Sequence, residues 1–168
     1  NCYPDLGPDA PDLITLPKNQ SITFGFFNNE YSNNENLDHQ VLCTIAPFEA
    51  DDKNYRFEGY RVYQLKDNKL DNNRLEVFQC DVKNNIKDIY SFTPNLDANG
   101  QPNSWNKIPY IQKSNNNGIP QSFTLIYDAF TGKRLQNGKT YYYTVVAYDY
   151  NNYEEFNTVE NYGQRKQY

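Results

Sequence analysis

Residues 135–150, LQNGKTYYYTVVAYDY, decide the fold of this chain. They open with Asn137-Gly138, a dipeptide that favours a tight turn. From Tyr141 onward, aromatic and β-branched residues alternate between two faces, as they do in a strand. One face carries Tyr141, Tyr143, Val145 and Ala147. We therefore expect a central strand that follows a tight turn and buries this face.

Length and composition predict a single all-β domain. With 168 residues, the chain is long enough for one well-buried core and short for two full domains. Its 16 Tyr and 10 Phe are residue types that strands favour. Strand-like stretches do not alternate with helical stretches of about 10 to 15 residues, which argues against an α/β fold.

Charge and hydropathy exclude two classes of partner. The net charge of −5 disfavours a nucleic-acid binder, which needs a basic surface. No apolar run approaches the roughly 20 residues that span a bilayer. The chain begins at Asn1 and contains no Met, so we expect a processed or excised piece of a longer protein. We expect that protein to be secreted or on the cell surface.

Other stretches also have the pattern of strands. They are residues 13–16, 21–27, 55–65 with its hairpin partner 74–82, and 121–130. In residues 55–65, alternation puts Tyr60 and Val62 on one face, and Phe57, Tyr63 and Leu65 on the other. The residues of 121–130 that we expect to point inward are Phe123, Leu125 and Tyr127.

The segments between and around these strands complete the expected organisation. Residues 1–12 are Pro-rich and should form an extended lead-in to a β-sandwich domain over 13–150. Residues 28–40 are a polar loop with little to bury. Residues 83–121 are a long insertion, in which we expect short strands near 86–92 and 105–111. Residues 151–168 are a polar tail without a strand pattern.

The chain resembles fibronectin type III-like modules, a group of immunoglobulin-like antiparallel β-sandwiches. In those modules a Leu precedes the tyrosine-corner Tyr of strand F by six residues, as Leu135 precedes Tyr141. The resemblance implies that the Tyr141 hydroxyl bonds to backbone near Leu135. It also implies that FEGYRVYQL is strand C, that SFTLIYDAF is strand E, and that the insertion lies before strand E.

The same resemblance implies a final strand G, for which residues 151–168 offer no alternating apolar run. Either the chain stops before that strand, or another segment supplies it. An open edge beside strand F would be a template for adding a strand. Most of residues 8–168 is also similar to modules of large surface proteins from gliding, type IX-secreting bacteria. The stretches that carry this similarity are PDAPDL, YRFEGYRVYQL, FQCDV and TYYYTVVAYDYN.

Three cysteines, an odd number, leave at least one thiol unpaired. Cys43 and Cys80 both lie in strand-like runs, where a free thiol behaves as a small buried hydrophobe. A bridge between them is the alternative. Cys2 could pair or stay free, so the sequence leaves the pairing open.

One motif suggests a metal and is better explained by a turn. Asn95, Asp97, Asn99 and Gly100 fit the first half of a calcium loop, but position 12 holds Asn106 instead of a bidentate carboxylate. Such a loop would hold Ca²⁺ only weakly. An Asn-Gly turn with side-chain hydrogen bonds explains the same residues, so we expect no metal and no other cofactor.

Catalytic constellations are not recognisable, whereas aromatic candidates for ligand binding are. His39 is the only histidine and lies in a polar loop, and no nucleophile motif surrounds a Ser. The insertion carries four aromatic residues among polar ones, as a carbohydrate-binding surface would. These residues are Tyr90, Phe92, Trp105 and Tyr110. The alternative for Trp105 is that it fills the core beneath the insertion.

The sequence therefore favours a module without catalytic activity. We expect it to serve assembly, spacing or adhesion through other protein chains or neighbouring domains of the same protein. The alternative is a carbohydrate-binding module that uses the aromatics of the insertion.

Overall fold

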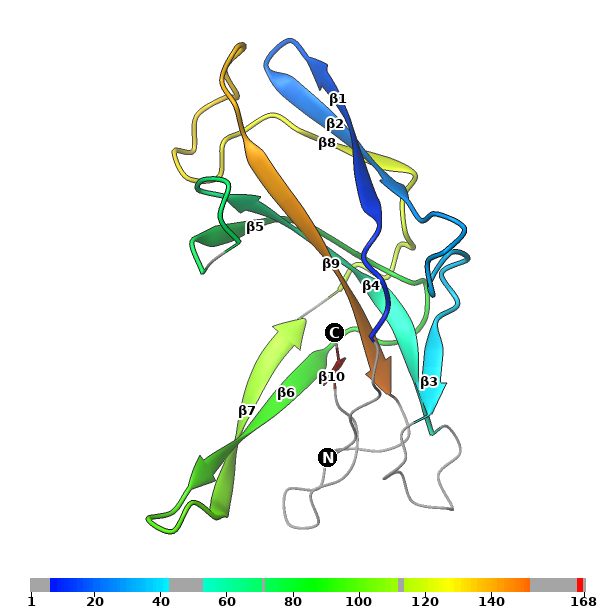
Figure 1. Cartoon of the computed structure of the whole chain (residues 1–168), viewed down its shortest axis with the longest axis vertical. Coiled ribbons are helices and arrows are strands. Elements are labelled where there is room, and N and C mark those ends of the chain that lie inside the picture. Colours follow the sequence, from blue (N-terminus) through cyan, green and yellow to red (C-terminus); the bar gives the residue numbers. More distant parts are fainter. Residues whose placement is uncertain (1–6, 43–52, 71, 112–113, 152–165, 168) are drawn as a thin grey trace.

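The computed structural model describes residues 7–42, 53–70, 72–111, 114–151 and 166–167 (Figure 1). Within these residues the chain is all-β, and strands and turns account for its regular structure without a helix. All strand pairs are antiparallel. Cys2 and Cys43 lie outside the described residues, and Cys80 is a free thiol, as expected in place of a bridge to Cys43.

The first sheet has three strands in the order β1-β2-β8. They are β1 (Asp12–Lys18), β2 (Ser21–Phe27) and β8 (Ser122–Leu125). A tight turn joins β1 to β2, while β8 arrives from far along the chain and pairs with the other edge of β2. The prediction for residues 21–27 is confirmed to the residue.

The second sheet is built around β4 (Asn54–Leu65). Strand β9 (Tyr142–Asn151) pairs with β4 along almost its whole length on one side. On its other side, β4 pairs with β5 (Arg74–Asp81) and with the short β3 (Gln40–Leu42). Strand β10 (Lys166–Gln167) pairs only with the C-terminal end of β9, where Lys166 faces Tyr150 and Gln167 faces Asp149.

The inner faces of the two sheets pack against each other, as in a β-sandwich. Phe24 of β2, Phe123 of β8 and Val62 of β4 are buried at the centre of this contact. The Phe123 ring stacks on Phe24 at a centroid distance of 5.1 Å and on Phe78 at 3.9 Å. The aromatic content that predicted strands therefore forms the core between the sheets.

A third sheet is the hairpin of β6 (Ile89–Leu96) and β7 (Pro102–Ile111). It contains the strands that we expected within the insertion, and both are longer than predicted. Figure 1 shows this hairpin in green, extending away from the other two sheets. At its base, Ile89 and Ile111 are buried against Tyr148 and Tyr150 on the outer face of β9.

A β-bulge in β4 makes one predicted face wrong. Opposite β9 the pairing shifts between Phe57 and Gly59, so Glu58 is an extra residue on β4. The shift reverses the alternation, and Phe57 joins Tyr60 in the core with their ring centroids 4.9 Å apart. Sequence alternation alone had put these two side chains on opposite faces.

Two further expectations, on Tyr127 and on the loop of residues 28–40, are wrong. Strand β8 ends at Leu125, and Tyr127 is 52% exposed in the turn that follows, where it bridges to Arg134. Residues 28–40 do bury side chains: Asn34 is fully buried and donates to the Tyr60 hydroxyl at 3.3 Å. Asn28 donates to the same hydroxyl at 2.9 Å, so polar side chains of the loop close one end of the core.

Candidate functional site

The β6–β7 hairpin is the element that places the predicted ligand-binding residues. Between Tyr90 and Asn95 its ladder is regular, so residues directly opposite each other share a face. The pairs on one face are Tyr90 with Pro109, Phe92 with Lys107, and Pro94 with Trp105. Backbone register therefore brings three of the four predicted aromatic residues to a single face, which we call the aromatic face.

Tyr110 belongs to the base of the hairpin and not to the aromatic face. Its half-buried ring meets Tyr148 edge-on at a centroid distance of 5.5 Å. The Arg61 guanidinium lies 4.5 Å from the centroid of the same ring. These contacts connect β7 to β4 and β9, so Tyr110 positions the hairpin. Tyr90 is half-buried, with the Lys107 ammonium 4.2 Å from its ring centroid.

The candidate calcium residues form the tip of this hairpin. Asp97 Oδ1 accepts the backbone N–H groups of Asn99 at 2.8 Å and Gln101 at 2.9 Å, and these bonds lower the pKa of Asp97. Gly100 adopts a φ of 77°, which a turn requires and glycine permits. Asn95 exchanges amide hydrogen bonds with Asn106. Across the described residues, no group of three His, Cys, Asp or Glu side chains is placed to hold a metal ion.

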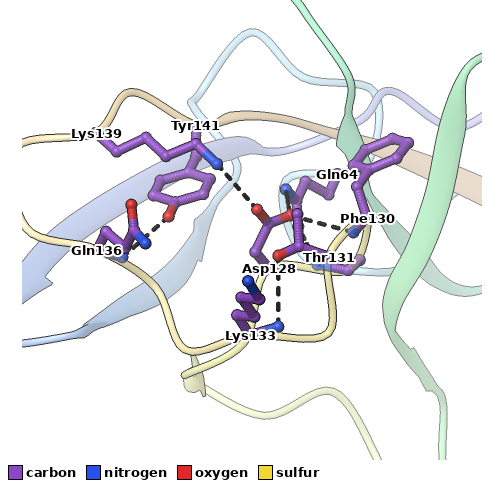
Figure 2. A network of polar contacts seen from close by, with 9 residues as sticks. Gln64, Asp128, Phe130, Thr131, Lys133, Gln136, Lys139 and Tyr141 are labelled. Atoms are coloured by element: carbon purple, nitrogen blue, oxygen red, sulfur yellow. Dashed lines mark hydrogen bonds and ion pairs between the residues drawn. The ribbon is translucent and has the colours of Figure 1, made fainter.

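The residues that we expected to hold the fold surround the entry to β9. Leu135 is 2% exposed, and its N–H donates to the Ile126 carbonyl at 3.0 Å. The Tyr141 hydroxyl accepts the backbone N–H of Gln136 at 2.9 Å (Figure 2). Further along, Tyr143, Val145 and Ala147 pack in the clusters that contain Val62 and Tyr60.

Sequence reasoning missed a polar network next to this corner, centred on Asp128 (Figure 2). The buried Asp128 carboxylate accepts Gln64 Nε2 at 2.8 Å, Lys139 Nζ at 3.0 Å and the Phe130 N–H at 3.1 Å. Burial alone would raise the pKa of Asp128, but these donors outweigh burial and hold the pKa at about 2. The network fixes the loop between β8 and β9 on the end of β4.

Buried carboxylates were also missed. Glu58 at the β4 bulge is 3% exposed, and burial raises its pKa to about 8 although Asn84 donates to Oε2 at 2.8 Å. Asp149 is fully buried, and burial raises its pKa to about 7. Its nearest described counter-group is His39, with Nε2 4.0 Å from Oδ2. Asp149 continues the series of inward-facing residues Tyr143, Val145 and Ala147. The alternation in the sequence could therefore have indicated that its carboxyl is buried.

The remaining groups with potential for chemistry are enclosed. Cys80 is a free, buried thiol, and burial raises its pKa to about 12. His39, near the end of the loop of residues 28–40, is only 9% exposed. A groove of about 730 Å³ lies between the β1–β2 turn and residues 135–141. Across it, Asn137 Oδ1 accepts the Gln20 N–H at 2.9 Å, and Asn137 Nδ2 donates to Asn19 Oδ1 at 2.9 Å.

Comparisons of the chain with protein-family models, with curated proteins and with solved structures find no match. The described residues also include no helix with the length and apolar character of a membrane span.

Proposed function

We propose that this chain is a fibronectin type III-like module without catalytic activity, which serves assembly, spacing or adhesion in a secreted or cell-surface protein. The strand order carries the proposal. The order β1-β2-β8 is that of strands A, B and E in an immunoglobulin-like sandwich, and the order β4-β9-β10 is that of strands C, F and G, which supports this proposal. The hydrogen bond from the Gln136 N–H to the Tyr141 hydroxyl matches a tyrosine corner at the start of strand F.

The environments of Cys80 and Asp128 support a role without catalysis. A nucleophilic cysteine needs an accessible thiolate, whereas the Cys80 thiol is buried and its pKa is raised. Asp128 holds a loop through Gln64 and Lys139, and its donors hold its pKa at about 2, so its carboxylate is a poor base near neutral pH. These groups hold the fold together.

The β6–β7 hairpin supports a role in interaction. It extends from the body on a fixed base, where Ile89, Ile111 and Tyr110 pack on the outer face of β9. A projecting element with a rigid base can present its side chains to a neighbour without rearrangement of the sandwich. We therefore place the contact with other chains or domains on this hairpin.

Deletion of the hairpin tests this proposal. In the parent protein, residues 90–110 are replaced by a two-residue Asn-Gly turn that leaves Ile89 and Ile111 at the base. We expect the module to remain folded and the surface assembly of the parent protein to fail. Normal assembly by this variant, and by a variant lacking residues 7–167, would refute the proposed role. The control replaces Thr93, which lies outside the aromatic face, with Ala.

Carbohydrate binding is the second candidate, and the register of the hairpin favours it. Tyr90, Phe92 and Trp105 share one face, and flat aromatic surfaces suit sugar rings. A glycan array probed with the wild-type chain and with Trp105→Ala tests it. The matched control is Ile108→Ala, which removes an exposed apolar side chain from the opposite face. Absence of binding to every glycan removes this candidate.

A further inference from the structure

The outer face of the first sheet, formed by β1, β2 and β8, gathers exposed apolar side chains. Leu13 of β1 and Phe24 of β2 turn toward the core, so the residues that alternate with them face outward. Three of the outward side chains are large and apolar, and each is more than half exposed: Ile14 at 57%, Leu16 at 56% and Phe27 at 53%. Apolar side chains exposed together on one face indicate an interaction site.

The residues beside these apolar side chains are small and keep the face flat. Ile14 pairs with Gly25, and Leu16 pairs with Thr23. Thr23 in turn pairs with Thr124 of β8, with the two Oγ1 atoms 2.9 Å apart. Because no long side chain stands over β2 here, another flat surface can approach this face closely.

The outer face of the second sheet differs, because the chain itself covers it. The base of the β6–β7 hairpin packs there on Tyr148 and Tyr150, and Arg61 forms an ion pair with Glu76. In the part of the chain that the structure describes, the apolar side chains on the outer face of the first sheet stay exposed. The first sheet is therefore the one whose outer face is available to another molecule.

The charged residues on this face lie at its two ends. Among the strand residues that face outward, they are Asp12 and Lys18, at opposite ends of β1, and both are exposed. A strand of this length spans roughly 20 Å, so these two side chains are too far apart to pair with each other. A second β1 strand that runs in the opposite direction would bring each of them to its opposite charge.

We propose that two copies of the chain associate through the outer faces of their first sheets, with β1 of one copy antiparallel to β1 of the other. The two-fold axis lies between the sheets, perpendicular to the strands and level with Thr15. Each Asp12 then lies beside Lys18 of the other copy, and each Ile14 lies beside the other Leu16. Packed sheets cross at only about 30°, which preserves this order of residues.

The same arrangement places large side chains against small ones along β2. Phe27 pairs with Asp12 and Ser21 pairs with Lys18, so the two-fold axis brings Phe27 of one copy to Ser21 of the other. Gly25 likewise meets Thr23 of the other copy. The face is therefore complementary to itself in both charge and size, which favours a second copy over a different protein.

Pairing of two copies through the edge of β1 is the other possible arrangement, and the sequence of β1 opposes it. Pro17 has no N–H to donate to a neighbouring strand, and Lys18 places a charge at the same end. The copies therefore meet through the face of the sheet and not through its edge.

The proposed interface is small, so we expect the association to be weak. Three strands about 4.8 Å apart and about 20 Å long present roughly 300 Å² per copy. A standard interface buries roughly 800 Å² per partner, so we expect a Kd on the order of 100 µM. Such a contact would be effective where many copies are held close together.

Sedimentation equilibrium of the whole chain at constant ionic strength, from about 10 µM to about 1 mM, tests the proposal. We expect the wild type to pass from monomer to dimer. Asp12→Lys and Lys18→Asp each bring like charges together in both pairs, and each should raise the Kd roughly tenfold. An equimolar mixture of these two variants should dimerise about as well as the wild type, because every pair then has opposite charges.

The control is Lys66→Asp, which makes the same change of charge at an exposed position between β4 and β5 and should leave the Kd unchanged. A wild-type chain that stays monomeric at about 1 mM would overturn this inference. A dimer whose Kd neither charge variant changes would also overturn it, and so would two weakened variants whose mixture does not recover.

This inference extends the proposed role in assembly but concerns a surface separate from the hairpin. The two can therefore fail independently. Normal surface assembly of the hairpin-deleted parent protein would reject the role of the hairpin, while recovery of the dimer in the mixture of charge variants would sustain the present inference.

Discussion

At the scale of single residues, Gly59 has the least room for a side chain among the described glycines. A Cβ atom at this position would lie 2.2 Å from the Cys80 carbonyl oxygen and 2.7 Å from the Tyr148 hydroxyl. Two of the three nearest atoms belong to the β5 backbone, which pairs with β4 at this point, so an added Cβ would force the two strands apart.

We predict that Gly59→Ala lowers the free energy of unfolding by about 3 kcal/mol, as severe overpacking does. Equilibrium unfolding in urea measures the change. Gly25→Ala is the matched control, because its Cβ would lie 3.5 Å from the nearest atom, the Gln121 carbonyl oxygen. A similar stability of the two variants would show that Gly59 has room for a side chain.

The Tyr141 hydroxyl is the second residue-scale feature. It accepts the Gln136 N–H at 2.9 Å and so ties the loop to the start of β9. We predict that Tyr141→Phe lowers stability by about 1 kcal/mol, the usual net value of one hydrogen bond. For a chain of this length, that is a fall in Tm of roughly 2–4 °C. Tyr142→Phe, at an exposed neighbouring position, is the control. Equal Tm values for Tyr141→Phe and wild type would contradict a structural role for the hydroxyl.

At the scale of elements, the alternation of apolar residues predicted strands well. It failed where a β-bulge shifts the alternation of side chains between the two faces of a strand. Strand β2 and the faces of β9 follow from alternation because each residue there continues the pattern of its neighbours. In β4, Glu58 adds one residue to the ladder, and Phe57 consequently turns to the core. Whether a residue is accommodated as a bulge depends on the partner strand, which a single stretch of sequence does not contain.

The hairpin illustrates the same limit for the candidate site. Turn signals and strand patterns predicted two strands in the insertion, and four aromatic residues marked it as a surface of interest. Only the register between β6 and β7 separates Tyr110 at the base from Trp105 on the aromatic face. Register depends on bulges near both ends of the hairpin, and these are set by pairing and not by composition.

The tip of the hairpin yields an element-scale prediction. Asp97 Oδ1 already accepts two backbone N–H groups, and among the described residues no group of three His, Cys, Asp or Glu side chains is placed to hold a metal ion, so we expect the tip to hold its turn without an ion. We predict the same Tm in EDTA and in millimolar Ca²⁺. A rise in Tm with Ca²⁺ that Asp97→Ala abolishes would instead establish a calcium site at this turn.

At the scale of the whole molecule, the burial of acidic side chains is the property that the sequence predicted least well. Composition gives a net charge of −5 and suggests that acidic residues are solvated. Glu58 and Asp149 are nevertheless buried, because the β4 bulge and the loop of residues 28–40 enclose them. Burial arises from segments distant in sequence, so charge counts do not reveal it.

These two carboxyls make stability depend on pH in a defined direction. Their pKa values rise from 4.5 to about 8 for Glu58 and from 3.8 to about 7 for Asp149, in both cases mainly through burial. At a pH between the pKa of the unfolded chain and the pKa of the folded chain, the folded chain binds more protons than the unfolded chain. Stability is therefore fully present at pH values below the unfolded pKa and is lost as pH rises toward 8. Asp128 has a lowered pKa, so its contribution changes only below about pH 4.

We predict that Tm falls between pH 5 and pH 8, and that Glu58→Gln with Asp149→Asn makes the profile flatter. The amides keep the shape and the polarity of the side chains but cannot ionise, so they remove the cost of a buried charge at high pH. Calorimetry at constant ionic strength measures the profile. Asp97→Asn, at an exposed carboxyl with a lowered pKa, should leave the slope between pH 5 and pH 8 unchanged. The same slope in wild type and in the double variant would mean that Glu58 and Asp149 are ionised in the folded chain.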